Sequence, residues 1–278
     1  MTVSLGERSE LLLDRLYLLA SSPSTENYLC ITARRQHGAR SVAIDRPTLA
    51  IVLRGAKQLR GAGGLIELHQ GDLFVVTRAC QFDAINTPDA ATGLYLTLTV
   101  PLCDEVIAAA QLLWSKPVAQ GGDDIVTMRA RKLEDELLAW SGAIEQGQYG
   151  EARLALAAML IRLCQWGHTQ VLVPPPPSVS AQVRALVAEK PDREWRSLDF
   201  ELALGVSAAT LRRRLSAEKT ALRSAVTEAR LSCAMELLYT TRWPIKTVAA
   251  RVGYRSAATF VQRFTERYGM DPGHIGNV

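Results

Sequence analysis

Residues 244–269 read PIKTVAARVGYRSAATFVQRFTERYG, and this stretch predicts two short helices that cross at a tight turn. Pro244 suits the first position of a helix, where its missing N–H costs nothing. Ala249 and Gly253 stand four residues apart, and two helices that cross closely need small residues there. Glycine also permits the positive φ of the turn, and Ser256 can cap the second helix. The pattern is that of a helix-turn-helix.

The second predicted helix has an apolar face and an outer face. Phe260 and Phe264 are separated by four positions, so they share one side of the helix, which we expect in the core. The outer face then carries Ala258, Val261, Gln262 and Thr265.

The same arrangement occurs once before, in LDFELALGVSAATLRRRL at residues 198–215. Gly205 is expected in the turn and Ser207 at the N-cap of the second helix. Leu211 and Leu215, four residues apart, form an apolar pair on one face of that helix. Its outer face carries Ala209, Arg212, Arg213 and Ser216. Arginines on an exposed helix face are often merely solvated. A second unit of the same kind, at a suitable spacing, would instead favour contact of these arginines with an acidic partner.

A single helix is predicted between the two units, over residues 220–241, with Thr220 as its cap. About 20 helical residues span roughly 30 Å. Major-groove faces on one side of B-DNA recur at about 34 Å. The spacing therefore predicts two reading helices placed one duplex turn apart, and it favours contact of the arginines with DNA.

Charge is divided unevenly along the 278 residues. Residues 1–177 carry 16 Lys and Arg against 18 Asp and Glu, whereas residues 178–278 carry 16 against 10. A basic segment joined to a mildly acidic one indicates a polyanionic partner for the basic segment alone.

Residues 180–274, about a third of the chain, resemble the DNA-binding domain of the AraC/XylS family of bacterial transcription regulators. TLRRRLSAEKT, RLSCAMELL and IKTVAARVGYRSAATFVQRFTERYGMDP occur in the family's order and spacing. The resemblance implies a double helix-turn-helix that reads two adjacent major grooves of double-stranded DNA. It also implies a transcription regulator, with activation favoured over repression.

The resemblance assigns a set of DNA-binding residues. Arg212 and Arg213 would pair with guanine, Gln262 with adenine, and Arg263 would hold a phosphate. Ala258 and Val261 would pack against thymine methyl groups. The full set is Ser207, Ala209, Arg212, Arg213, Ser216, Ser256, Ala257, Ala258, Val261, Gln262 and Arg263.

Three positions depart from the family pattern. Glu201 stands where alanine is usual, so we expect its carboxylate to push the first helix pair apart or to find a partner such as Arg214. We accordingly expect the substitution Glu201→Ala to leave the melting temperature unchanged or to raise it. Lys219 replaces a common glycine. Asp271 replaces Ser or Thr before Pro272, and it can cap a helix equally well.

The N-terminal part contains two kinds of hydrophobic pattern and ends at a run of prolines. Residues 28–100 alternate apolar and polar residues in short segments, which predicts strands, and residues 104–168 show helical spacing. VPPPPSVS breaks helix and strand alike. We therefore predict a multidomain α+β protein, with residues 1–173 as one domain, 174–179 as a proline linker and 180–278 as an all-α domain.

The strands resemble the cupin-like jelly roll that accompanies this DNA-binding domain. That resemblance implies a sensing domain for a small-molecule effector or a regulatory protein. The segment EARLALAAMLIRLCQWG (residues 151–167) is apolar nearly all round. We expect the 104–168 helices to form a homodimer contact, with burial in the domain's own core as the alternative.

A cupin enzyme with an accessory DNA-binding tail is the rival hypothesis. Metal-dependent cupins use clustered histidines and a glutamate, but residues 1–177 contain only His37, His69 and His168, with no HxH pair. We expect no metal, no cofactor and no catalysis. Arg35 and His37 share a face of the predicted strand 28–37 and are the candidate ligand-binding residues, unless they merely lie at a solvated strand end. Tyr95 is expected to pack under a helix.

Cellular location follows from what the chain lacks. The five cysteines are widely spaced without a CxxC pair, which is typical of reduced cytosolic proteins. LLLDRLYLLASS (residues 11–22) is interrupted by charge and predicts an amphipathic helix rather than a signal peptide. No stretch approaches the ~18 apolar residues of a membrane span. The expected location is the cytoplasm.

Overall fold

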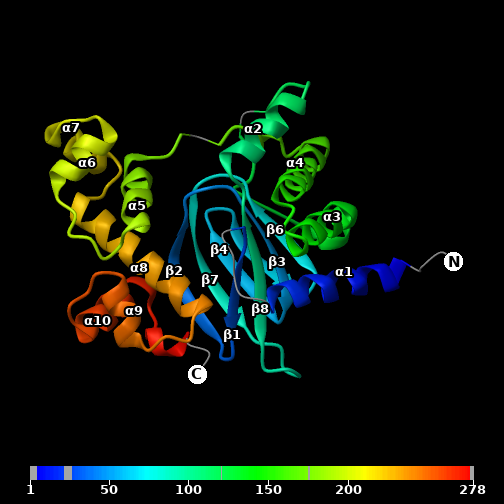
Figure 1. Ribbon diagram of the computed structural model, residues 1–278, viewed down its shortest axis with the longest axis horizontal. Coiled ribbons are helices and arrows are strands. Elements are labelled where there is room, and N and C mark those ends of the chain that lie inside the picture. The colour runs from blue at the N-terminus through cyan, green and yellow to red at the C-terminus, as the bar shows by residue number, and fades with distance from the viewer. Residues whose placement is uncertain (1–4, 22–26, 120, 175, 276–278) are drawn as a thin grey trace. The chain divides into compact units, whose positions relative to one another are not determined.

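The computed structural model describes residues 5–21, 27–119, 121–174 and 176–275. The chain divides into two compact units, Met1–Pro175 and Pro176–Val278 (Figure 1). The boundary lies inside the proline run, which cannot continue either a helix or a sheet. The N-terminal unit combines two sheets with helices, and the C-terminal unit is helical.

Two antiparallel sheets form the centre of the N-terminal unit. The five-stranded sheet has the order β1-β8-β3-β6-β9, and the four-stranded sheet has the order β2-β7-β4-β5. The strands are β1 (Leu29–Ala33), β2 (His37–Ile44), β3 (Thr48–Arg54), β4 (Ala56–Gly61), β5 (Gly64–His69), β6 (Asp72–Val76), β7 (Cys80–Thr87), β8 (Tyr95–Pro101) and β9 (Ile125–Arg129).

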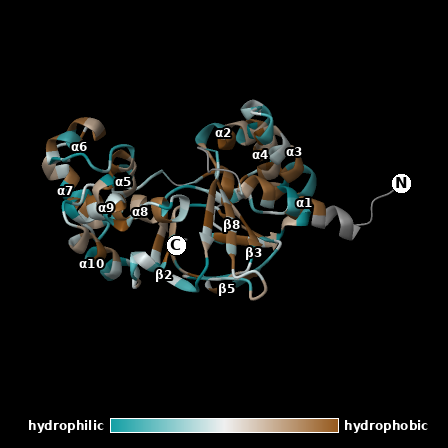
Figure 2. Cartoon of the chain, turned by 60° about the horizontal axis from the view of Figure 1, so that its bottom comes forward, coloured by the Kyte–Doolittle hydropathy of each residue, from teal (hydrophilic) through white to brown (hydrophobic). Residues whose placement is uncertain are grey.

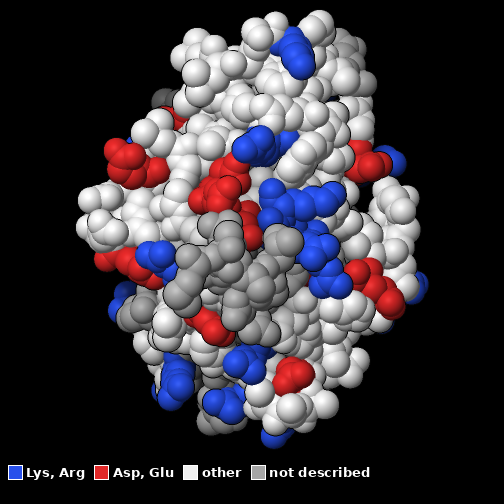
Figure 3. Space-filling view, turned by 90° about the vertical axis from the view of Figure 1, so that its right-hand side faces the viewer, with Lys and Arg blue, Asp and Glu red and all other residues white. Residues whose placement is uncertain are grey.

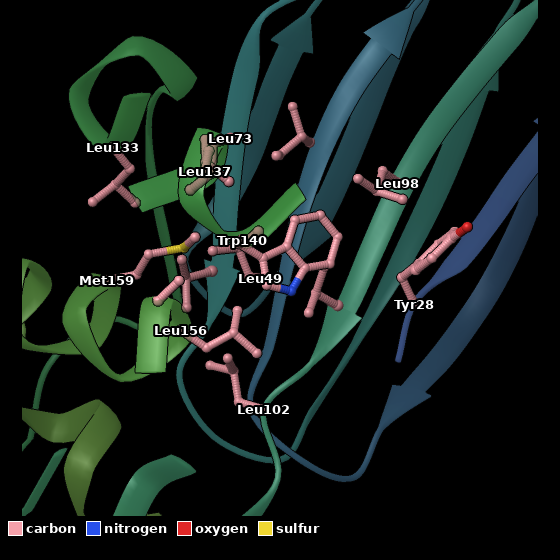
Figure 4. Close-up of a cluster of buried hydrophobic side chains, with 14 of the residues drawn as sticks. Tyr28, Leu49, Leu73, Leu98, Leu102, Leu133, Leu137, Trp140, Leu156 and Met159 are labelled. Carbon is pink, nitrogen blue, oxygen red and sulfur yellow. The ribbon is translucent and has the colours of Figure 1, made fainter. Parts of the chain in front are cut away.

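Helices cover one face of the five-stranded sheet. They are α1 (Leu5–Ala20), α2 (Asp104–Leu113), α3 (Glu134–Glu145) and α4 (Tyr149–Gln165). Trp140 of α3 is buried among leucines of the sheet and of α4, such as Leu98 and Leu156 (Figure 4). Its ring meets Tyr28 edge to face, with centroids 6.1 Å apart. This helix-covered face is the larger core of the unit.

A second cluster fills the space between the two sheets. It includes Val52 and Phe74 from the five-stranded sheet and Leu59 and Phe82 from the four-stranded one. Alternate residues of β8 therefore point into different cores, because successive strand side chains face opposite sides. Figure 2 shows β3 and β8 as largely hydrophobic, as expected for strands buried on both faces.

Three sequence expectations for this unit are wrong. Ile125–Arg129, predicted as helix, is strand β9, paired with β6 at the edge of the sheet; its β-branched residues favour that conformation. Residues 28–37 do not form one strand, since β1 ends at Ala33 and His37 opens β2 in the other sheet. Tyr95 packs between the sheets and not under a helix.

Helix α4 buries most of its apolar residues in its own unit. Leu156, Met159, Leu160 and Leu163 are at most 6% exposed, whereas Leu154 is 61% exposed. Burial in the core of its own unit therefore explains why this helix is so apolar. This was the alternative to a dimer contact that the sequence left open. A dimer contact through it stays a prediction that would use Leu154.

The C-terminal unit is built around one long helix. It contains α5 (Val179–Glu189), α6 (Ser197–Leu204), α7 (Ala208–Ala217), α8 (Leu222–Thr240), α9 (Ile245–Arg251) and α10 (Ala257–Tyr268). In Figure 1, α8 runs between the α6–α7 pair and the α9–α10 pair. Ala225 and Ala229 of α8 lie in the core that α5, α6 and α7 share.

Candidate nucleic-acid interface

The first helix pair has the geometry that its sequence predicts. Gly205 ends α6 with φ 62°, and the Ser207 hydroxyl caps α7 by accepting from the Thr210 N–H at 3.3 Å. Leu211 and Leu215 are 2% and 1% exposed. Because those two leucines hold one face of α7 in the core, the opposite face is turned to solvent.

The arginine run lies on that solvent face. Arg212, Arg213 and Arg214 are all exposed, as are Ala209 and Ser216. The predicted base-facing set of the first unit is therefore brought together on one accessible helix surface. Such a surface can enter a major groove, which admits a helix.

The second pair repeats this construction. Gly253 lies in the turn with φ 82°, and the Ser256 hydroxyl accepts from the Thr259 N–H at 3.3 Å. Phe260 and Phe264 are fully buried, with ring centroids 5.5 Å apart. On α10, Ala258, Gln262 and Arg263 are exposed, while Ala257 and Val261 are half-buried.

Glu266 engages two of the predicted DNA-binding side chains. Gln262 Nε2 donates to Glu266 Oε1 at 2.9 Å, and Arg263 Nη1 donates to Oε2 at 3.1 Å. One turn of helix separates Gln262 from Glu266, which brings them onto the same face. A base or phosphate bound by Gln262 or Arg263 would have to compete with this carboxylate, a constraint that sequence reasoning missed.

Glu201 has a structural partner that the sequence did not reveal. Its carboxylate accepts from the Ala208 N–H at 3.1 Å and from the Ser197 hydroxyl at 2.8 Å. Ala208 is the first residue of α7, so Glu201 provides a second cap for α7. Arg214 is not the partner in these bonds, and Gly205 still closes the turn.

Glu201→Ala should therefore lower the melting temperature of the C-terminal unit, contrary to the expectation from sequence. Loss of a helix cap costs about 1 kcal/mol, or roughly 4 °C for a unit of this size. Differential scanning calorimetry of the full chain measures the change. Glu201→Gln keeps an acceptor and is the control, for which we expect a smaller loss; a melting temperature at or above wild type for Glu201→Ala would contradict this role.

Two other departures from the family pattern also have a structural explanation. Lys219 has φ 56°, the left-handed conformation that glycine adopts without strain. Asp271 caps the final turn by accepting from the Gly273 N–H at 2.7 Å, as predicted. Thr220 does not cap the long helix: α8 begins at Leu222, and its N-cap residue is Ala221.

Arg230 of α8 connects the two helix pairs. Its guanidinium donates to the carbonyl oxygens of Pro191 (2.9 Å), Arg193 (2.8 Å) and Gly253 (3.4 Å). Pro191 and Arg193 precede α6, and Gly253 forms the turn of the second pair. One side chain thus joins the segment that precedes the first pair and the turn of the second pair to α8, a role that no local pattern in the sequence signals.

A second bridge lies further along α10. Arg267 donates to Glu228 of α8, and Arg184 of α5 is 3.6 Å from the same carboxylate. Glu228 is mostly buried, so its charge needs these partners. The two bridges tie α5, the segment before α6, the turn of the second pair and α10 to α8.

A family model described as a helix-turn-helix domain matches residues 202–277, and the curated relatives include AraC-family regulators. The C-terminal unit is an AraC/XylS-type DNA-binding domain. The virulence regulon transcriptional activator VirF of Shigella flexneri is 29% identical over 105 residues, which are 38% of this chain and 40% of VirF. The regulator YdeO of Escherichia coli is 26% identical over 145 residues, 51% of this chain and 56% of YdeO.

Solved structures share the fold of this chain over most of its length. Apo ToxT from Vibrio cholerae has a TM-score of 0.66 and 13% identity, over 91% of this chain and 97% of ToxT. ToxT with a bound unsaturated fatty acid has a TM-score of 0.60 and 14% identity, over 90% and 95%. At this identity the likeness establishes the fold, a β-containing N-terminal unit followed by helix-turn-helix pairs.

The two candidate ligand-binding residues of the N-terminal unit, Arg35 and His37, differ in their exposure to solvent. Arg35 is exposed in the turn between β1 and β2, whereas His37 is 6% exposed and points between the sheets. Over the residues that the structure covers, no three histidine, cysteine, aspartate or glutamate side chains cluster as metal ligands would. Among the described helices, none combines the length and apolar character needed to cross a membrane.

Proposed function

We propose that the chain is a sequence-specific, double-stranded-DNA-binding regulator of transcription that reads two adjacent major grooves with α7 and α10. The exposed arginine face of α7 carries this proposal, and Arg230 joins the segment before α6 to the turn of the second pair. On the side of the molecule shown in Figure 3, basic and acidic side chains are interspersed.

The contacts proposed for each helix follow the predicted residue set. Arg212 and Arg213 pair with guanine edges, and Ala209 and Ser216 approach the neighbouring bases or backbone. On α10, Ala257, Ala258 and Val261 pack against thymine methyl groups, while Gln262 and Arg263 exchange Glu266 for DNA. The hydroxyls of Ser207 and Ser256 stay at the helix caps, close to where a phosphate would lie.

The N-terminal unit is proposed to control this activity in the cytoplasm. Its sheets are proposed to form a cupin-like jelly roll that binds a small-molecule effector or a regulatory protein. One ToxT structure holds an unsaturated fatty acid and another a substituted butenoic acid, which supports a small molecule as the effector. The 104–168 helices are the proposed homodimer contact, and the activator VirF supports activation as the outcome.

The rival hypothesis of an enzyme is weaker because the aligned relatives are named as regulators of transcription. Metal analysis of the purified protein separates the hypotheses, since stoichiometric iron, manganese or zinc would favour the enzyme.

Arg213→Ala should weaken specific DNA binding by about 1–3 kcal/mol and relax one base position, because a bidentate arginine–guanine pair is lost. The site is first defined by selecting bound sequences from random duplex DNA with the full chain. Affinity for that site is then measured at fixed salt. Arg60→Ala, an exposed arginine of β4, is the matched control and should bind like wild type; an unchanged footprint for Arg213→Ala would mean that the arginine is merely solvated.

A further inference from the structure

A carboxylate lies on the outer face of α10, beside the residues proposed to contact DNA. Glu266 is exposed, and its side chain is 50% accessible to solvent. It follows Gln262 by one turn of helix, whereas Phe260 and Phe264 hold the opposite face of α10 in the core. A major groove that receives Gln262 would therefore receive Glu266 as well.

The first helix pair differs from the second in this respect. The sequence of α7 contains no acidic residue, and Glu218 follows directly after it. The two carboxylate oxygens of Glu218 accept from the backbone N–H groups of Val179 and Ser180, at 2.7 and 2.9 Å. These bonds commit Glu218 to the start of α5. Of the two outer faces proposed to enter DNA, it is that of α10 which presents a carboxylate.

The hydrogen bonds that Glu266 accepts are weak enough to be replaced. Its two oxygens accept from the side chains of Gln262 and Arg263 on the same helix. Exposed pairs at this spacing change an equilibrium by only about twofold. Arg267 does not add to them, because it donates to Glu228 of α8. When Gln262 and Arg263 turn to DNA, the carboxylate of Glu266 is left in the groove without their donors.

The chemistry of a carboxylate decides which base suits it. A carboxylate accepts hydrogen bonds and donates none, so it needs a donor on the floor of the groove. Cytosine presents its N4 amino group there, whereas guanine, adenine and thymine each present at least one acceptor on their own major-groove edge. A hydrogen bond to a charged acceptor is also stronger than one between neutral groups. Glu266 is therefore attracted by cytosine and repelled by an acceptor at the same position.

We propose that Glu266 is a specificity-determining residue of the second helix pair, which selects cytosine by accepting a hydrogen bond from its N4 amino group. Side chains one helical turn apart are separated by about 5–6 Å, and successive base pairs by about 3.4 Å. The cytosine should therefore lie within about two base pairs of the adenine proposed for Gln262. The inference deepens the proposed function by naming one more base of the DNA site, and it rests on that function.

The test is a change of base preference in the full chain. Wild type, Glu266→Gln and Glu266→Ala each select bound sequences from random duplex DNA at one salt concentration. Wild type should prefer cytosine at one position by about fivefold to a hundredfold, the range expected for a good contact between a side chain and a base. Glu266→Gln should change this preference to adenine, because an amide both donates and accepts. Glu266→Ala should abolish the preference, since no polar group remains.

Glu189→Gln is the matched control. Glu189 is an exposed glutamate at the end of α5, outside both helix pairs, so the variant makes the same chemical change elsewhere in the unit. It should select the same sequences as wild type. The melting temperature of every variant should also match that of wild type, because exposed pairs contribute little to stability. A purely structural role for Glu266 would not convert a preference for cytosine into one for adenine.

Two outcomes separate this inference from the function on which it rests. If both Glu266 variants select the same bases as wild type, or bind every sequence more tightly by one common factor, Glu266 is merely a repelled charge and the inference is overturned. The proposed function survives either result. If wild type shows no preferred sequence at all, the proposed function fails, and this inference fails with it.

Discussion

Gly253→Ala should destabilise the C-terminal unit by about 3 kcal/mol and weaken specific DNA binding at least tenfold. A left-handed φ costs an alanine roughly 1 kcal/mol, and crowding in a packed interior adds about 1–3 kcal/mol. Gly253 has φ 82°, and an added Cβ would lie 2.8 Å from the Pro191 carbonyl oxygen and 3.0 Å from Arg230 Cζ. The methyl group would therefore push apart the groups through which Arg230 joins the two helix pairs.

Gly205→Ala is the matched control, because Gly205 holds the equivalent turn of the first pair. It has φ 62°, but an added Cβ would meet no atom within 4 Å. We expect a loss of about 1 kcal/mol from backbone strain alone. Denaturant unfolding of both full-chain variants separates strain from crowding, and equal losses of stability would refute the role assigned to the contact with Pro191 and Arg230.

Lys57→Met should stabilise the N-terminal unit at pH 6 by on the order of 3 kcal/mol. Burial lowers the pKa of Lys57 from 10.5 to about 7, so the folded state binds a proton less tightly than the unfolded state. At about 1.4 kcal/mol per pKa unit this amounts to a cost of roughly 5 kcal/mol below pH 7. Leaving the Asn86 amide oxygen without its donor offsets about 1–3 kcal/mol of the gain.

The pH dependence of that gain identifies its cause. The unfolded state binds more protons than the folded state between pH 7 and pH 10.5, so wild-type stability should rise with pH through this window. The advantage of Lys57→Met should consequently be complete below pH 7 and shrink as pH approaches 10. Chemical denaturation at pH 6 and pH 9.5, with Lys116→Met as the reference, measures it; a gain that does not change with pH would show that the Lys57 pKa is not lowered.

The sequence identified the helix-turn-helix pairs because their determinants are local. Gly205 and Gly253 supply the turns, Ser207 and Ser256 the caps, and each signal acts within about four residues of the helix it sets. Glu201 shows where local reasoning ends. Its mismatch with the family pattern was visible, but its partner is a backbone N–H seven residues away across the turn.

The N-terminal unit was predicted less completely because strand pairing is not local. The β-branched start of β9 has helix-like spacing of apolar residues, and only its pairing with β6, some 50 residues earlier, decides its conformation. The break between β1 and β2 likewise follows from the two segments joining different sheets. The alternation of apolar and polar residues shows which side of a strand is buried. It does not show which sheet the strand joins.

By itself the sequence determined two helix-turn-helix units, a basic C-terminal segment, a β-rich segment before it and a proline boundary between them. Periodicity, turn residues and charge act over short distances along the chain, and they can be read without knowing the fold. Only the tertiary structure placed Arg230 against both helix pairs and brought His37, Lys57 and Asn86 into one buried row. Those groups are 20 to 49 residues apart in sequence, and their meeting depends on sheet register and helix packing, which no local pattern encodes.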